Sequence, residues 1–258
     1  MGCNLVRGEE LKENELIFLR SEDHLAFQYH EAQDLDLIFR KYSFSGLIND
    51  KQWELIISTL GLGIGRYIHS DAVRDFYEEF KTSEGYLLPY FLILAVYLSQ
   101  GGLDIKASIL FDAFDPKATK IMTRKTSENM IDGIIFVLID KMYLLCQKIY
   151  PNNESLEVLY EKLMERKDKF KEKFMKMLVS DKNYITKDQF LDAFTDSYAK
   201  KLLNSGYLRR AVLADKSKKL SKGQNVVEVE RHGGVEETSA RDFADFDHNI
   251  PLSSEDED

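Results

Sequence analysis

Residues 110–130 read LFDAFDPKATKIMTRKTSENM, and this stretch decides how the rest of the chain is interpreted. Its first apolar residues recur at helical spacing, and the Asp115-Pro116 pair then ends that helix. A polar loop follows, and the apolar Met122 lies inside it. Apolar positions at helical spacing resume at Met130, so a second helix is expected to begin near residue 123. The stretch therefore predicts two helices joined by a polar loop.

Three other segments have the same order of helix, polar break, apolar residue and helix. The apolar residue is Ile48 in the first segment, Leu88 in the second and Ile185 in the fourth. Loops of this kind pair through a short antiparallel bridge between these residues, because a single loop would leave its strand edge unpaired. We therefore expect two pairs of units, separated by Gly101-Gly102.

This pattern resembles the EF-hand, whose loop has Asp at the first place, Gly at the sixth, an apolar residue at the eighth and Glu at the twelfth. Asp115 and Met122 stand at the first and eighth places of the third loop, whereas Lys120 stands at the sixth and Thr126 at the twelfth. The resemblance covers residues 34–200. It implies an all-α fold built from two pairs of EF-hand-like helix-loop-helix units.

The four loops lack the charged oxygens that calcium requires. Calcium takes about six to eight oxygen ligands, and the motif depends on a bidentate acid at its twelfth place. The twelfth places here hold neutral side chains, namely Gln52, Leu92, Thr126 and Gln189. The third loop keeps Asp115 with Thr119 and Thr123 as neutral oxygens, so these three residues form the weak candidate metal site. We expect no cofactor and no tight calcium binding.

The chain is expected to divide into four parts. Residues 1–33 form an N-terminal lead-in, residues 34–102 the first pair, residues 103–200 the second pair with an extended linker helix, and residues 201–258 a helical end with an acidic tail. The tail has too few apolar residues to offset chain entropy, which predicts disorder. Ser253 and Ser254 precede acidic residues and are candidate phosphorylation sites, with a plain solvated tail as the alternative.

The N-terminal sequence Met1-Gly2-Cys3 is typical of proteins that are myristoylated on Gly2 and palmitoylated on Cys3. A single myristoyl chain holds a membrane only marginally, so Cys3 would supply the second acyl chain. The motif favours Ser or Thr at the sixth residue, where this chain has Val6, and a chance Gly-Cys pair is the alternative. Lipidation predicts a cytoplasmic protein that is attached to a membrane peripherally.

Composition and charge exclude several classes of protein. The net charge of −9 argues against general nucleic-acid binding, which needs a basic face. The longest apolar run, residues 131–146, contains charged side chains, so we interpret it as a buried helix and not as a membrane span. The two cysteines, Cys3 and Cys146, argue against a disulfide framework.

The sequence contains no recognisable catalytic constellation. Its five histidines are scattered, and the Gly-rich residues 61–65 lack the Lys-Ser/Thr of a phosphate loop. Within the EF-hand superfamily, the chain resembles the lipidated neuronal calcium sensors and calcineurin-B-like proteins, which hold an amphipathic partner helix in an apolar groove. The residues that would line such a groove here are Trp53, Ile57, Phe91, Leu94, Ile135, Leu138 and Leu145. Ordinary core is the alternative for each of them.

The leading hypothesis is a non-catalytic, calcium-independent adaptor that is tethered to a membrane and binds a helix of a partner protein. One alternative is the regulatory subunit of a phosphatase, kinase or channel. The other is a helical scaffold unrelated to EF-hands, in which the repeat is accidental.

Overall fold

The computed structural model describes residues 13–63 and 69–214, and these residues are mostly helical with two small antiparallel sheets. All of them fall in the first of two units, Met1–Ser217; the second, Lys218–Asp258, lies outside the described residues. The predicted lipidation sites Gly2 and Cys3 and the predicted phosphorylation sites Ser253 and Ser254 also lie outside them. The helical class expected from the sequence is confirmed.

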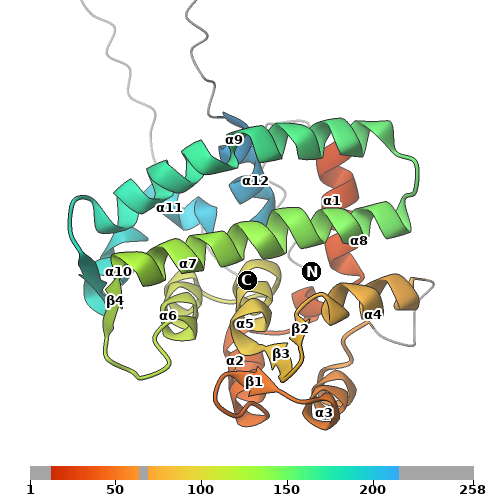
Figure 1. The fold of residues 1–258 in the computed structure, drawn as a ribbon, viewed down its shortest axis with the longest axis horizontal. Coiled ribbons are helices and arrows are strands. Elements are labelled where there is room, and N and C mark those ends of the chain that lie inside the picture. Colours follow the sequence, from red (N-terminus) through yellow and green to blue (C-terminus); the bar gives the residue numbers. More distant parts are fainter. Residues whose placement is uncertain (1–12, 64–68, 215–258) are drawn as a thin grey trace, which may run out of the picture. The chain divides into compact units, whose positions relative to one another are not determined.

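The N-terminal elements alternate helices with very short strands (Figure 1). The helices are α1 (Glu13–Asp23), the 3-10 helix η1 (Phe27–Tyr29), α2 (Ala32–Lys41), α3 (Asp50–Leu60), α4 (Ser70–Glu78) and α5 (Leu88–Leu98). The strands are β1 (Leu47–Ile48), β2 (Lys81–Thr82) and β3 (Gly85–Leu87), in the sheet order β1-β3-β2.

The C-terminal elements include the longest helix of the described chain, α9 (Glu154–Val179). The other helices are α6 (Leu103–Ala113), α7 (Arg124–Ile135), the π-helix η2 (Phe136–Lys141), α8 (Met142–Ile149), α10 (Lys187–Ala193), α11 (Ser197–Leu202) and α12 (Ser205–Ala214). The strands β4 (Ile121–Thr123) and β5 (Tyr184–Thr186) form the second sheet. Figure 1 shows α7 and α8 running in line beside α9, which both helices contact.

Helix α5 lies at the centre of the hydrophobic core. Every residue from Phe91 to Leu98 is buried, as expected for a helix that is apolar on all sides. The helix contacts α2, α6, α7 and η2, so elements from both predicted pairs pack against it. One continuous cluster of buried apolar residues therefore joins the two pairs.

The second sheet has the predicted register. Met122 pairs with Ile185, and these are the two apolar residues that marked the third and fourth loops in the sequence. Both side chains are buried. In the first sheet, however, Ile48 pairs with Tyr86 and not with the predicted residue, Leu88. The prediction for the second loop is therefore wrong by two residues.

The physical reason for this shift is a tight hairpin between β2 and β3, which pairs Thr82 with Gly85. Gly85 has φ +139°, and a Cβ atom there would lie 2.7 Å from the carbonyl oxygen of Ile48, so glycine lets the strands approach. The strand ends at Leu87, and Leu88 is already the first residue of α5.

The corrected register changes the chemistry of the second loop. With Tyr86 at the eighth place, the first place becomes Glu79 and the twelfth becomes Tyr90 in place of the predicted Leu92. The twelfth place remains without a carboxylate.

Helix α9 begins at a side-chain cap. Its N-cap is Asn153, whose side-chain oxygen accepts a hydrogen bond of 3.0 Å from the backbone N–H of Leu156. A side-chain acceptor at this place satisfies one of the unpaired N–H groups of the first helical turn.

Candidate functional site

The predicted twelfth-place residues of the first and fourth loops act as helix caps. The Oε1 atom of Gln52 accepts the backbone N–H of Asn49 at 2.8 Å, and the Asn49 side chain accepts the N–H of Gln52 at 3.0 Å. Thr186 and Gln189 make the same reciprocal pair at 3.3 Å in each direction. Both are capping boxes, so these side chains reach back to the backbone of their own helix and not toward a metal position.

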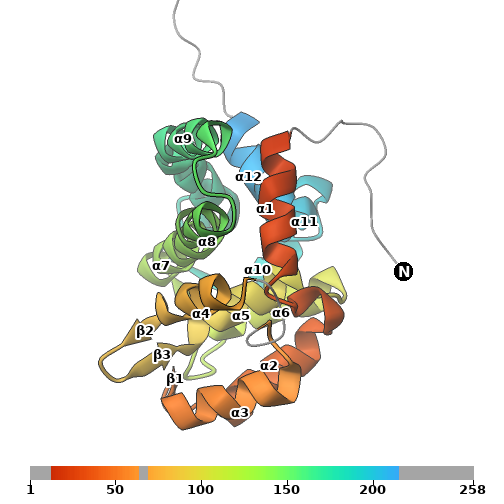
Figure 2. The ribbon, with the colours of Figure 1, turned by 90° about the vertical axis from the view of Figure 1, so that its right-hand side faces the viewer.

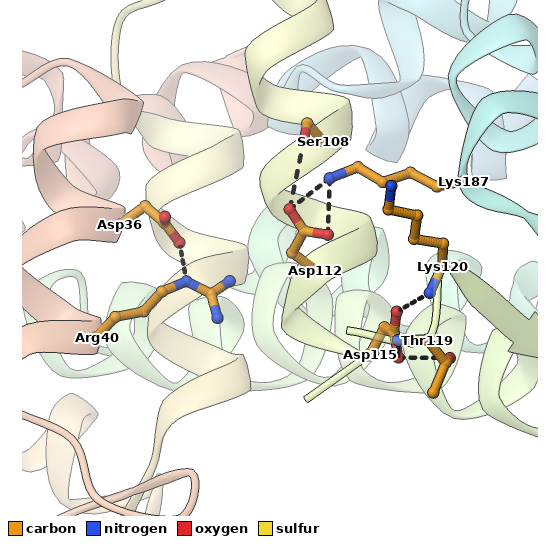
Figure 3. A network of polar contacts seen from close by, with 8 residues as sticks. All are labelled: Asp36, Arg40, Ser108, Asp112, Asp115, Thr119, Lys120 and Lys187. Atoms are coloured by element: carbon orange, nitrogen blue, oxygen red, sulfur yellow. Dashed lines mark hydrogen bonds and ion pairs between the residues drawn. The ribbon is translucent and has the colours of Figure 1, made fainter. Parts of the chain in front are cut away.

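The third loop is organised around the carboxylate of Asp115 (Figure 3). One oxygen accepts the backbone N–H of Thr119 at 3.0 Å and its hydroxyl at 2.8 Å, and the other accepts the backbone N–H of Lys120 at 2.7 Å. Burial alone would raise the pKa of Asp115, but these hydrogen bonds outweigh it and hold that pKa below its usual value. Both carboxylate oxygens are therefore already engaged by the protein.

The three weak metal candidates are not arranged as one ligand set. Asp115 and Thr119 contact each other, whereas the Thr123 hydroxyl accepts the backbone N–H of Thr126 at 3.2 Å and caps α7. Residues 13–63 and 69–214 contain no group of three or more His, Cys, Asp or Glu side chains that could hold a metal ion. At this loop the Asp115 carboxylate already accepts three hydrogen bonds from Thr119 and Lys120, which use most of its roughly four acceptor sites.

The predicted partner groove is closed in this structure. Of its seven residues, six are buried and Ile57 is partly buried. Trp53 shows why, because its ring lies 4.6 Å from that of Phe91, 5.0 Å from that of Tyr77 and 5.3 Å from that of Tyr86. These side chains form ordinary core, which was the alternative interpretation of each.

Two ion pairs connect the region of α4 with η2 and α8. Lys141 Nζ lies 2.6 Å from a carboxylate oxygen of Glu79, and Lys148 Nζ lies 2.6 Å from one of Asp75. The partners of each pair belong to different predicted pairs of units. Helices α4 and α8 also pack directly against each other in this region.

Helix α12 covers the other side of the C-terminal half. It contacts α1, η2 and α9, and Figure 2 shows α1 and α12 side by side. Leu208 and Val212 are fully buried there, and a guanidinium nitrogen of Arg166 on α9 donates to the carbonyl of Leu213 near the end of α12. Helix α12 therefore covers a surface of the chain that would otherwise be apolar and open.

A buried ion pair anchors α12 to α1. Arg209 Nη1 lies 2.7 Å from Glu22 Oε1, and the Ser205 hydroxyl donates to Glu22 Oε2 at 2.8 Å. Arg209 also donates to the carbonyl of Leu138 in η2 at 3.3 Å, and its guanidinium lies 4.5 Å from the ring centre of Phe18. The pair thus connects α1, η2 and α12 inside the core.

Cys146 lies in the same region and is a structural thiol. It is fully buried, and burial raises its pKa to about 12. A thiol with so high a pKa is almost entirely protonated at neutral pH and is a poor nucleophile.

An apolar pocket between α9 and α11 remains open, and it encloses about 220 Å³. Its floor consists of the buried side chains of Phe170, Phe174 and Leu202. The partly buried Met177 and Tyr198 form its walls, with Lys173 and Asp196 exposed at the rim. We call this cavity the α9–α11 pocket.

The sequence contains the apolar spacing that forms this pocket, but the pocket is not among the predicted sites. Phe170, Phe174 and Met177 follow one another at helical spacing, which indicates an apolar face of α9. Tyr198 and Leu202 repeat that spacing on α11. Spacing predicts an apolar face, but whether another element covers that face depends on the tertiary structure.

Among the described residues, no helix is both long enough and apolar enough to cross a membrane. A scan against protein-family models returns no match, and neither a search of curated proteins nor a search of solved structures finds one.

Proposed function

We propose that this protein is a non-catalytic adaptor with an EF-hand-like fold that works without calcium and binds a helical segment of a partner protein. Two pairs of helix-loop-helix units with antiparallel strands between their loops support the EF-hand-like part of this proposal. Loops that satisfy their polar groups with hydrogen bonds of their own support the calcium-independent part.

The observation that carries the proposal is the α9–α11 pocket. Apolar cavities at the surface are the usual places for a ligand side chain to bind. The partner would therefore bind at α9 and α11, because the groove expected from the sequence is filled by core residues such as Trp53 and Phe91.

Calorimetry with calcium tests the first part of the proposal. We expect no heat of binding at micromolar calcium and no change in hydrogen exchange at residues 115–126. Micromolar binding at any loop would contradict the metal-independent adaptor.

Affinity capture followed by quantitative mass spectrometry tests partner binding at the pocket. Met177→Asp places a charge in the wall of the α9–α11 pocket, and Val158→Asp makes the same type of change at an exposed position near the other end of α9. We expect the same proteins to be captured by the wild type and by Val158→Asp, and to be lost with Met177→Asp. Equal capture by all three folded chains would argue against the pocket as the binding site.

The membrane tether is a separate part of the proposal and rests on Gly2 and Cys3. We propose that both are acylated and that the protein is a peripheral membrane protein of the cytoplasmic face. Mass spectrometry of the intact N-terminus from eukaryotic cells decides this point, because unmodified Gly2 and Cys3 would remove the tether.

A further inference from the structure

We propose that the α9–α11 pocket binds an acidic peptide segment of a partner protein and that one bulky apolar side chain of this segment enters the cavity. This inference rests on the proposed adaptor function and specifies the chemistry of its partner. It is carried by three observations, namely the size of the cavity, its apolar floor and the charge of its surroundings.

The size of the cavity fits a single large side chain. An apolar protein cavity of about 150 Å³ is enough to bind a benzene ring. The 220 Å³ of the α9–α11 pocket therefore accommodates one aromatic or leucine-sized group with some room to spare. Phe170 and Phe174 lie 5.5 Å apart between ring centres and offer their rings to such a group.

The surface around the pocket is basic although the whole chain carries a net charge of −9. Residues 166–176 of α9 contain six basic and two acidic side chains, whereas residues 154–165 contain one basic and four acidic side chains. The pocket lies in the basic half of the helix. On its other side, Lys200 and Lys201 are exposed in the last turn of α11.

One cation at the rim has a defined position. Lys173 lines the pocket with its ammonium 5.2 Å from the ring centre of Tyr198. Lys176 is exposed one turn further along the same face of α9. An acidic residue flanking the apolar anchor would meet these two charges.

Asp196 is the carboxylate among the lining residues, and its charge is already partly balanced. Its Oδ1 accepts the backbone N–H groups of Tyr198 at 2.8 Å and Ala199 at 3.2 Å, where it caps α11. The exposed lysines in and near the lining, namely Lys173, Lys176, Lys200 and Lys201, therefore outnumber this one lining carboxylate.

An anionic membrane would also be attracted by these lysines, but the pocket favours a peptide. A membrane contacts a broad outer face, whereas the pocket lies between two helices and is lined by the buried side chains of Phe170, Phe174 and Leu202. A single projecting side chain can enter such a pocket, and a flat lipid surface does not. Membrane binding is therefore an outcome that the test must be able to detect.

The test measures fluorescence anisotropy of labelled twelve-residue peptides titrated with the full chain. The acidic probe has one central Phe flanked by Glu residues, and two comparison probes replace that Phe by Ala or the Glu residues by Lys. We expect the acidic Phe probe to bind and each replacement to weaken binding about tenfold or more, because each removes one of the two required features.

Protein variants locate the site. Met177→Asp and the double variant Lys173→Glu/Lys176→Glu are expected to reduce binding of the acidic probe about tenfold, whereas Val158→Asp and Lys162→Glu in the acidic half of α9 are expected to leave it unchanged. Circular dichroism confirms that each variant is folded. Raising the salt concentration should weaken binding of the acidic probe.

Three outcomes would overturn the inference. If the Lys probe binds at the pocket and the acidic probe does not, the adaptor proposal stands but its partner is not acidic. If no probe binds the folded chain, the pocket does not take this class of peptide, and the capture experiment with Met177→Asp judges the adaptor proposal separately. If phosphatidylserine vesicles bind through the lysines and Met177→Asp has no effect, the basic surface serves a membrane.

Discussion

Replacing Arg209 by Met should destabilise the fold more than the loss of a surface ion pair, because it leaves a buried charge behind. Glu22 and Arg209 are 187 residues apart in the chain, and their side chains are 8% and 4% exposed. Without the guanidinium, the carboxylate of Glu22 keeps one hydrogen bond, from Ser205. Removing one partner of a buried pair typically costs about 3–5 kcal/mol of unfolding free energy.

The chain contains a matched comparison for this prediction. Lys148 and Asp75 lie 2.6 Å apart, close to the 2.7 Å of the buried pair, but their side chains are 43% and 54% exposed. Solvent screens an exposed pair, so Lys148→Met should cost less than about 1 kcal/mol. The difference between the two Met substitutions therefore reports the effect of burial at nearly equal distance, together with the loss of the contacts of Arg209 with Leu138 and Phe18.

Urea denaturation followed by circular dichroism measures both free energies. The double variant Glu22→Gln/Arg209→Met should recover a large part of the loss, because it removes the uncompensated charge. The reasoning is refuted if Arg209→Met costs no more than Lys148→Met, or if the double variant is as unstable as the sum of the two single variants. Unchanged m-values are required for the comparison.

Three further predictions concern the loops. Asp115→Asn should lower the unfolding free energy by about 1–3 kcal/mol at pH 7, because the amide NH₂ cannot accept the bonds that the carboxylate takes from Thr119 and Lys120. The folded-state pKa of Asp115 is lowered, so its contribution to the unfolding free energy is complete above the unfolded pKa of about 3.9 and is lost as the pH falls through the folded-state pKa. Denaturation at pH 7 and below pH 4 should therefore show the unfolding free energies of wild type and variant converging at low pH. Gln189→Ala should cost about 0.5–1 kcal/mol in thermal unfolding, because it breaks the reciprocal cap with Thr186, and an equal melting temperature would contradict this. Gly85→Ala should lower the unfolding free energy in urea more than Gly46→Ala, because a Cβ at Gly85 meets a backbone oxygen at 2.7 Å whereas one at Gly46 meets nothing within 4 Å. Both positions have positive φ, so equal losses of unfolding free energy would mean that the close contact at Gly85 is relieved.

Local sequence patterns predicted the helices and one of the two sheets. Met122 and Ile185 pair as predicted, although each follows another apolar or aromatic residue, Ile121 or Tyr184. The second loop has a run of three large apolar residues, Tyr86, Leu87 and Leu88, and only the structure shows that Tyr86 is the paired one. A run of apolar residues does not fix a register, because several alignments bury the same kind of side chain.

The sequence could not predict which apolar faces remain open. Trp53 and Phe91 have the composition of a binding groove, and the same residues make a good core. The outcome depends on contacts between distant parts of the chain, such as that of Lys141 with Glu79, 62 residues apart. Such pairs have no local signature, because the sequence offers many other lysines and glutamates as partners.

The same contacts constrain where a partner can bind under the proposed function. A ligand shifts a conformational equilibrium only by its difference in affinity for the two states. In a calcium-switched protein the ion supplies that difference, but here Gln52, Gln189 and both oxygens of Asp115 already satisfy the loops from within. A partner that used the core around Trp53 would itself have to supply the free energy to separate four packed aromatic rings. A partner that binds the α9–α11 pocket meets an apolar site that is already open, and this is why we assign the adaptor's binding surface to it.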